Sequence, residues 1–179
     1  DPAALYVLEG GSNDLMYTPE LIVPNQLETL FVLQSYGARH IVLVNIPDVG
    51  KSPRYVTTPL SGYISAACGL LNEALMAYLP AVTLPGVQIT IGDMYGFLDS
   101  VAADPEAYGL TNVQQAYLTD GAGQSPTTWL FWDDYHPTTV GHGLFAEDVE
   151  GSLLVNYSPG KGRIGQGEIN SLHGLVKTH

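Results

Sequence analysis

Apolar residues along the chain fall into short continuous runs that alternate with longer stretches of helical spacing. The runs 40–46 and 87–91 are rich in Ile and Val, and such runs predict strands buried on both faces of a parallel sheet. Between them, apolar residues recur every three or four positions over 62–79, which predicts a helix with one buried face. The other expected strands are 6–8 and 129–132, and the other expected helices are 19–36, 94–102 and 138–154. Because strands alternate with helices, the pattern predicts an α/β fold with a parallel sheet.

The length of 179 residues suits one domain with a core of its own. Residues 104–128 are expected to be mostly loop. From residue 156 the chain turns into a stretch rich in Gly and Lys or Arg that resembles a linker. We therefore expect a domain over 1–155 and a tail of unassigned role over 156–179.

Charge and composition exclude several classes of partner. The chain has 6 Lys and Arg against 18 Asp and Glu, which gives a net charge of −12, so it is an acidic protein. Such a surface repels phosphate backbones, and we expect no nucleic-acid partner. No run reaches the ~18 apolar residues of a membrane span, so none is expected. Cys68 is the only cysteine and lies in an apolar stretch, which predicts a core residue and excludes an intrachain disulfide.

Two short polar blocks stand at expected carboxyl ends of strands, where open α/β sheets bind ligands. In Gly11-Ser12-Asn13-Asp14, after the first strand, the Asn13 amide suits donation to a developing oxyanion. Asp133 precedes His136 by three residues and can reach the imidazole Nδ1–H within one tight turn. That contact would leave Nε2 free as a general base. Pro137 is expected to begin the last helix and to hold His136 at a rigid corner.

The two blocks, Gly11-x-Asn13-Asp14 and Asp133-x-x-His136-Pro137-Thr138, resemble the third and fifth blocks of the SGNH, or GDSL, hydrolases. The stretches 43–50 and 105–113 are similar to the bacterial esterase/lipase branch, and the resemblance covers about residues 3–150. It implies a three-layer α/β/α, flavodoxin-like fold and cofactor-free hydrolysis of small-molecule esters. It also implies a secreted or cell-surface protein.

By the same resemblance, Asn13 would be an oxyanion donor, His136 the general base and Asp133 the carboxylate that orients it. In that family a Gly-Asp-Ser block with the nucleophile and a second block with an oxyanion Gly precede these residues. Only ten residues precede Gly11 here, so we expect a domain truncated at its N-terminus, without the usual serine. Ser12 adjoins Asn13 and is the best-positioned substitute nucleophile; the alternative is a structural turn residue.

Aromatic residues gather around the expected histidine corner. Trp132 and Tyr135, together with Gly11, are our candidates for substrate binding, and core packing is the alternative for the two aromatics. No metal site is expected. On a helix, the six-residue spacing of His136 and His142 would put them on different faces.

The sequence thus predicts a carboxylic ester hydrolase of esterase/lipase type. The rival hypothesis is a catalytically inactive fragment that binds a ligand or a partner. In the 2-1-3-4-5 strand order of flavodoxin-like folds, loss of the first two strands would leave residues 6–8 as an open edge. Open edges pair readily, so we expect a homodimer through this edge, or association with a complementing N-terminal fragment; the alternative is that the tail, 156–179, covers the edge.

Overall fold

A computed structural model describes residues 1–82 and 84–155. The expected tail, 156–179, lies outside the described residues. In chain order the helices and strands are β1 (Leu5–Leu8), η1 (Ser12–Asp14), α1 (Pro19–Ser35), β2 (His40–Val44), η2 (Val49–Lys51), α2 (Ser61–Tyr78), η3 (Leu79–Ala81), β3 (Gln88–Gly92), α3 (Met94–Ala103), η4 (Pro105–Tyr108), β4 (Asn112–Ala116), α4 (Tyr117–Asp120), η5 (Pro126–Thr128), β5 (Trp129–Phe131) and α5 (Thr139–Val155). The η elements are short 3-10 helices. Every helix and strand predicted from the sequence is present.

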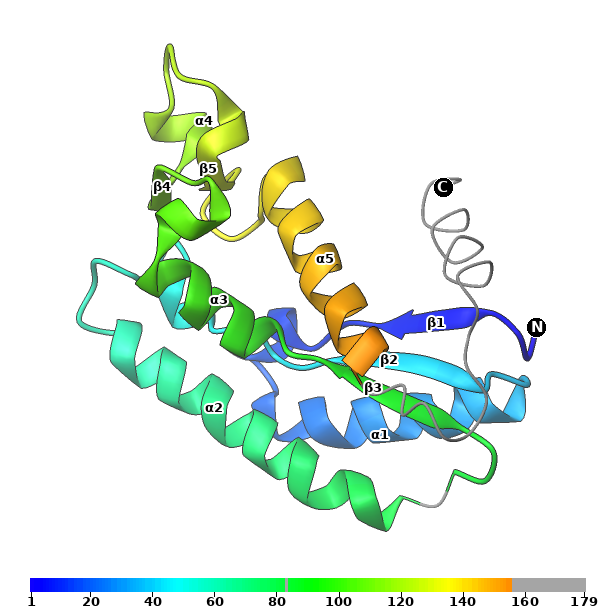
Figure 1. Ribbon diagram of the computed structural model, residues 1–179. Helices are drawn as coiled ribbons and strands as arrows, with labels where there is room; N and C mark the ends of the chain where they lie inside the picture. Colours follow the sequence, from blue (N-terminus) through cyan, green and yellow to red (C-terminus); the bar gives the residue numbers. More distant parts are fainter. Residues whose placement is uncertain (83, 156–179) are drawn as a thin grey trace.

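The main sheet consists of three parallel strands in the order β1-β2-β3. Leu5 of β1 is in register with His40 of β2, and His40 with Gln88 of β3. Figure 1 shows α1 and α2 on one face of this sheet and α5 on the other. The predicted α/β fold with a parallel sheet is confirmed, and β1 is an edge strand with one pairing partner among the described residues.

A second, two-stranded parallel sheet pairs β4 with β5. The expectation that 104–128 is mostly loop is therefore wrong for 112–120, where β4 is followed directly by α4. Polar residues hid this strand, because two of its five positions are exposed glutamines. The expected strand at 129–132 exists as β5, and it pairs with β4 rather than joining the main sheet.

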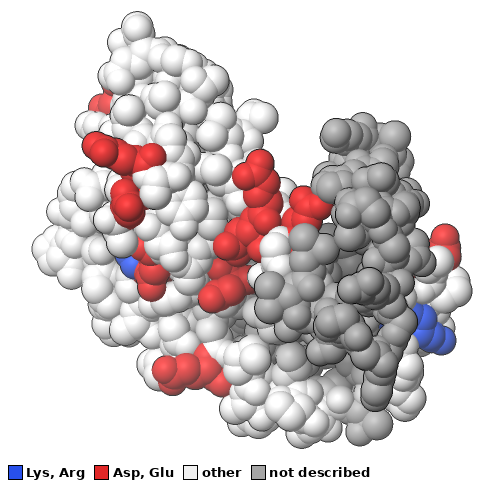
Figure 2. Space-filling model, in the orientation of Figure 1, with Lys and Arg blue, Asp and Glu red and all other residues white. Residues whose placement is uncertain are grey.

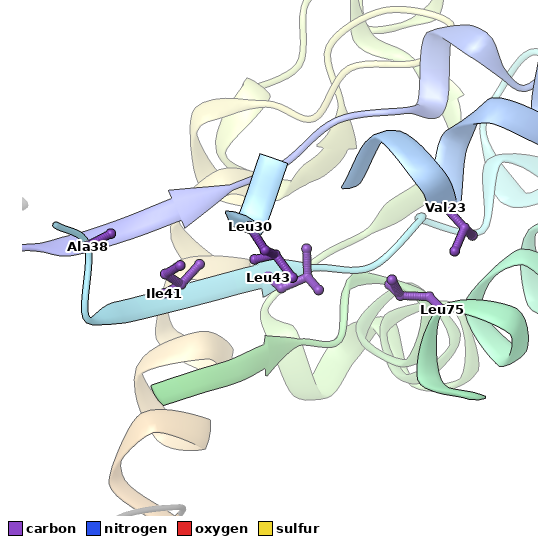
Figure 3. Packing of buried hydrophobic residues seen from close by; sticks show 6 residues of the cluster. All are labelled: Val23, Leu30, Ala38, Ile41, Leu43 and Leu75. Carbon is purple, nitrogen blue, oxygen red and sulfur yellow. The ribbon is translucent and has the colours of Figure 1, made fainter. Parts of the chain in front are cut away.

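The core of the main sheet lies between β2 and the pair of helices α1 and α2. Leu30 of α1, Leu43 of β2 and Leu75 of α2 are fully buried together, and Figure 3 shows them with Val23, Ala38 and Ile41. On the opposite face, a Cβ added at Gly92 of β3 would lie 3.3 Å from Val149 of α5. Helices thus cover both faces of the sheet, and the runs 40–44 and 88–92 are apolar for that reason.

Cys68 is fully buried in α2, as expected from its apolar surroundings. Among the described residues one helical stretch, Ser61–Ala81, is long and apolar enough to cross a membrane by length and composition alone. This is weak evidence for a span, because core helices pass the same test, and Ile64, Cys68 and Leu75 of this stretch are buried. On the face in Figure 2, Asp and Glu side chains outnumber Lys and Arg.

Candidate active site

The turn after β1 carries Asn13. Gly11 begins this turn with φ +107°, a left-handed conformation that side chains rarely adopt. A Cβ at Gly11 would lie 2.7 Å from Ile22 Cγ2 and 3.1 Å from Ile46 Cδ1, so the turn rests directly on the core. Asn13 follows in η1 with an exposed side chain. Glycine at position 11 is thus required by the turn that presents the Asn13 amide.

Two buried polar atoms lie at the same turn without a hydrogen-bond partner among the described residues: Ser12 Oγ and Gln26 Oε1. The other end of the Gln26 amide donates to the Gly10 carbonyl at 3.0 Å and so fixes the end of β1. Ser12 Oγ is enclosed, whereas a nucleophile must be open to its substrate. In the described chain no hydrogen bond joins Ser12 to His136.

The second part of the candidate site is the turn between β5 and α5. His136 Nδ1 lies 2.8 Å from Asp133 Oδ2. Asp133 Oδ1 also accepts the backbone N–H groups of Tyr135 and His136, at 2.9 and 2.7 Å. Partial burial on its own would raise the pKa of the Asp133 carboxyl, but the hydrogen bonds from these two backbone groups and from the imidazole outweigh it and lower that pKa.

The imidazole of His136 faces solvent on its other side. Its side chain is 74% exposed, and no described residue makes a hydrogen bond to Nε2. With Nδ1 held by a carboxylate, the bond fixes the tautomer in which Nε2 carries the lone pair. The pair is therefore arranged to take a proton at Nε2 from a group placed against it.

The turn is fixed at both ends by backbone bonds. Trp132 N–H donates to the His136 carbonyl at 2.7 Å, and Phe131 pairs with Pro137 in an antiparallel bridge. The prediction that Pro137 begins the last helix is wrong, because α5 begins at Thr139. The reason is that this bridge keeps Pro137 in extended pairing with the end of β5.

Thr138 connects this turn to the helix that follows. Its buried hydroxyl donates to the Trp129 carbonyl at 2.7 Å and accepts the Gly141 N–H at 3.1 Å. The second bond is the contact that an N-cap residue makes. Sequence reasoning overlooked Thr138 as a functional support, although a Thr immediately before a helix is a usual start signal.

Trp132 and Tyr135, the two aromatic candidates for substrate binding, flank the turn and are both partly exposed. Trp132 stacks on Tyr117, with ring centroids 5.4 Å apart. Trp132 also lines a cavity of about 210 Å³, together with Pro126, Thr127, Thr138, Thr139 and Val140. A mostly apolar hollow therefore opens beside the histidine turn.

A larger and more open hollow of about 400 Å³ lies by the carboxyl ends of β2 and β3. It is lined by Asn45, Gly69, Asn72, Glu73, Met76, Asp93 and Tyr95. No three His, Cys, Asp or Glu side chains in the described part of the chain are grouped so that they could hold a metal ion.

The loop after β2 contacts the histidine turn, and this was not expected from the sequence. Arg54 N–H donates to the Asp134 carbonyl at 3.1 Å. The rings of Tyr55 and Tyr135 meet edge to face at 6.1 Å, with their hydroxyls 3.5 Å apart. The hydrogen bond to Tyr55, followed by partial burial, raises the pKa of the Tyr135 phenol. These partners are some eighty positions apart, and no local pattern indicates such a contact.

Residues 1–149 match the sequence model of the family described as GDSL-like lipase/acylhydrolase. The thermolabile hemolysin of Vibrio parahaemolyticus is 28% identical over 168 residues, which cover 81% of this chain and 40% of that protein. Esterase EstA of Pseudomonas aeruginosa is 27% identical over 176 residues, covering 86% of this chain and 27% of the esterase. A GDSL esterase/lipase of Arabidopsis thaliana is 26% identical over 178 residues, which cover 78% of this chain and 49% of that protein. The chain thus spans between about a quarter and a half of these relatives' lengths.

Proposed function

The chain belongs to the family of GDSL-like lipases and acylhydrolases, and from this premise we propose that it carries the acid–base part of a carboxylic ester hydrolase. One observation above all supports the proposal: the Asp133 carboxylate holds Nδ1 of His136 at 2.8 Å and leaves Nε2 exposed. In the proposed reaction, Nε2 takes the proton of a serine hydroxyl as the oxygen attacks the ester carbonyl. The carboxylate stabilises the imidazolium that forms.

We propose Asn13 as a donor to the oxyanion of the tetrahedral intermediate. Its exposed amide follows the end of β1, and the Gly11 turn holds the backbone in place. When the intermediate collapses, His136 returns its proton to the leaving alcohol. Water then hydrolyses the acyl-enzyme through the same imidazole. No cofactor takes part in this scheme.

The nucleophile is proposed to come from outside these 179 residues, because no Gly-Asp-Ser triplet occurs in them. The outer edge of β1, with which no described strand pairs, is the place where a complementing N-terminal segment would pair, beside the Asn13 turn. Ser12 stands as the substitute nucleophile only if its enclosed hydroxyl becomes accessible. A secreted or cell-surface location remains an expectation from the family.

The experiment compares hydrolysis of short p-nitrophenyl esters by the full chain, alone and with an added N-terminal fragment of a related hydrolase that carries Gly-Asp-Ser. We expect low turnover alone and a rise towards ordinary enzyme rates, about 10 s⁻¹, on addition. In the complemented protein, His136→Ala should lower kcat by at least ~10², since general-base catalysis is lost. His142→Ala, on the exposed side of α5, is the matched control.

An active-site phosphonate followed by mass spectrometry then identifies the nucleophile. Label on the added serine supports complementation, and label on Ser12 would promote Ser12 instead. Full activity of His136→Ala would contradict the proposed role of the histidine.

A second proposal, an inactive module that binds a ligand or partner, is favoured by the enclosed Ser12 hydroxyl alone. It predicts neither turnover nor labelling in any arm, together with saturable binding of a non-hydrolysable ester analogue.

A further inference from the structure

The two proposed catalytic turns stand on different sheets. Asn13 follows β1 of the three-stranded sheet, and His136 follows β5 of the two-stranded sheet. In Figure 1 the strands β4 and β5 lie apart from the main sheet. The position of the imidazole relative to the Asn13 amide therefore depends on whatever joins these two parts.

Tyr55 contacts both parts. Its ring packs against the buried cluster of Leu15, Ile22, Ile46, Ile64 and Cys68. That cluster supports the Asn13 turn, because Leu15 directly follows η1 and a Cβ at Gly11 would meet Ile22 and Ile46. The other side of Tyr55 meets the ring of Tyr135, the residue before His136, edge to face at 6.1 Å.

The loop around Tyr55 is itself held in place. Tyr55 N–H and Val56 N–H both donate to the carbonyl of Ser52, at 2.9 Å, and Thr58 N–H donates to the carbonyl of Tyr55 at 2.7 Å. Next to Tyr55, Arg54 N–H donates to the Asp134 carbonyl within the histidine turn. These hydrogen bonds hold the loop in one conformation, so Tyr55 keeps a fixed position between the two parts.

We propose that Tyr55 is a positioning residue that joins the core under the Asn13 turn to the His136 turn. The catalytic consequence rests on the proposed function, whereas the mechanical link does not. An edge-to-face pair of this kind stabilises its partners enough to shift a local opening equilibrium about fivefold. The hydroxyl contact, at 3.5 Å, is long and adds less than the ring does.

The test measures amide hydrogen exchange by NMR on the full chain. Tyr55→Leu keeps an apolar side chain in the core but removes the aromatic contact. We expect exchange at Trp132 and His136 in the histidine turn, and at Asp14 in the Asn13 turn, to become about fivefold faster, with β2 unchanged. Tyr55→Phe, which keeps the ring, should restore most of the protection. Tyr63→Leu, exposed on α2, is the matched control and should change none of these amides.

Tyr135→Leu removes the same ring contact from the partner residue. Because Tyr135 is partly exposed, we expect this variant to fold even if Tyr55→Leu does not. It should speed exchange in the histidine turn and at Asp14, because it removes the same ring contact. In the double variant Tyr55→Leu/Tyr135→Leu, amide exchange in the histidine turn should be no faster than in either single variant. Unchanged exchange in Tyr55→Leu, or a uniform increase over β2 and both turns, would overturn the proposal.

With the complementing fragment present, Tyr55→Leu should lower kcat with little change in KM, because the imidazole and the oxyanion donor lose their alignment. A reduced kcat that Tyr55→Phe does not rescue would contradict positioning by the ring. If the complemented wild-type protein proves inactive, the proposed function fails, while the exchange measurements still decide the role of Tyr55.

Discussion

Asp133 receives three hydrogen bonds on one carboxylate, two from backbone N–H groups and one from the imidazole of His136. The backbone bonds come from the tight turn itself and do not depend on the histidine side chain. The charged carboxylate therefore stabilises the turn, in addition to its proposed catalytic role.

This arrangement predicts a specific response to acid. The folded-state pKa of Asp133 is lower than its ordinary 3.8, so its contribution to stability is fully present above that value and is lost as the pH falls through the lowered pKa. The measurement is an NMR titration of the Asp133 carboxyl carbon. In His136→Ala the backbone bonds remain, so the pKa of Asp133 should rise only part of the way to its value in the urea-unfolded chain. A return all the way would show that the backbone bonds contribute nothing.

Gly11 permits a prediction in which conformation and contact can be separated. Gly11→Ala forces a side chain into φ +107° and against Ile22, and should lower the free energy of unfolding by about 2–4 kcal/mol. Gly37→Ala shares a positive φ, +96°, but has no atom near the new Cβ, and should lose about 1–2 kcal/mol. Gly10→Ala has neither a positive φ nor an atom near the new Cβ, and should lose the least stability of the three. Urea unfolding of the three variants in any other order would contradict this account.

Among the elements, α5 depends on the cap at its first turn. Thr138→Val keeps the shape of the side chain but leaves the buried Trp129 carbonyl and the Gly141 N–H without their partner. We expect a loss of about 2–3 kcal/mol in the free energy of unfolding, measured in urea. Thr138→Ser should recover most of it, and Thr139→Val, which alters an exposed neighbour, should be nearly neutral. A serine variant as unstable as the valine variant would refute the role of the hydroxyl.

The elements that the sequence predicts well are those with a local signature. The apolar runs of β2 and β3 and the helical spacing in α2 depend only on residues close in sequence. The contact between Asp133 and His136 is local in the same way. The strand β4 was missed because its exposed glutamines break the apolar pattern. In α1, Leu21 and Phe31 are apolar like buried Leu30, yet both are 46% exposed. Spacing identified the helix but could not tell which apolar positions the sheet would cover.

On the scale of the whole molecule, the outer edge of β1 predicts association. Among the described residues no strand pairs with the outer edge of β1, where the side chain of Val7 is 64% exposed, and no charged residue interrupts Ala3 to Leu8. Light scattering should show the mean mass rising with concentration towards a dimer. Val7→Lys should keep the chain monomeric, whereas Tyr63→Lys, an equal charge on α2, should not. A wild-type chain that stays monomeric at the highest concentration would rule out this association.

The contact between Tyr55 and Tyr135 marks the limit of prediction from one sequence. Nothing near either residue indicates the other, because the contact exists only after two sheets have packed. The same holds for the relation of Asn13 to His136: each block could be assigned a chemical type from its residues, while their arrangement depends on the assembled fold.

Asp133 and His136 lie only three positions apart, and loops that short close in well under a microsecond. Asn13 stands near the other end of the described chain and takes its place only after long-range pairing, which is orders of magnitude slower. A folding chain can therefore close the Asp133–His136 turn long before the Asn13 turn reaches its place. In the proposed function, activity would therefore require two later events, the docking of the Asn13 turn and the supply of the complementing serine.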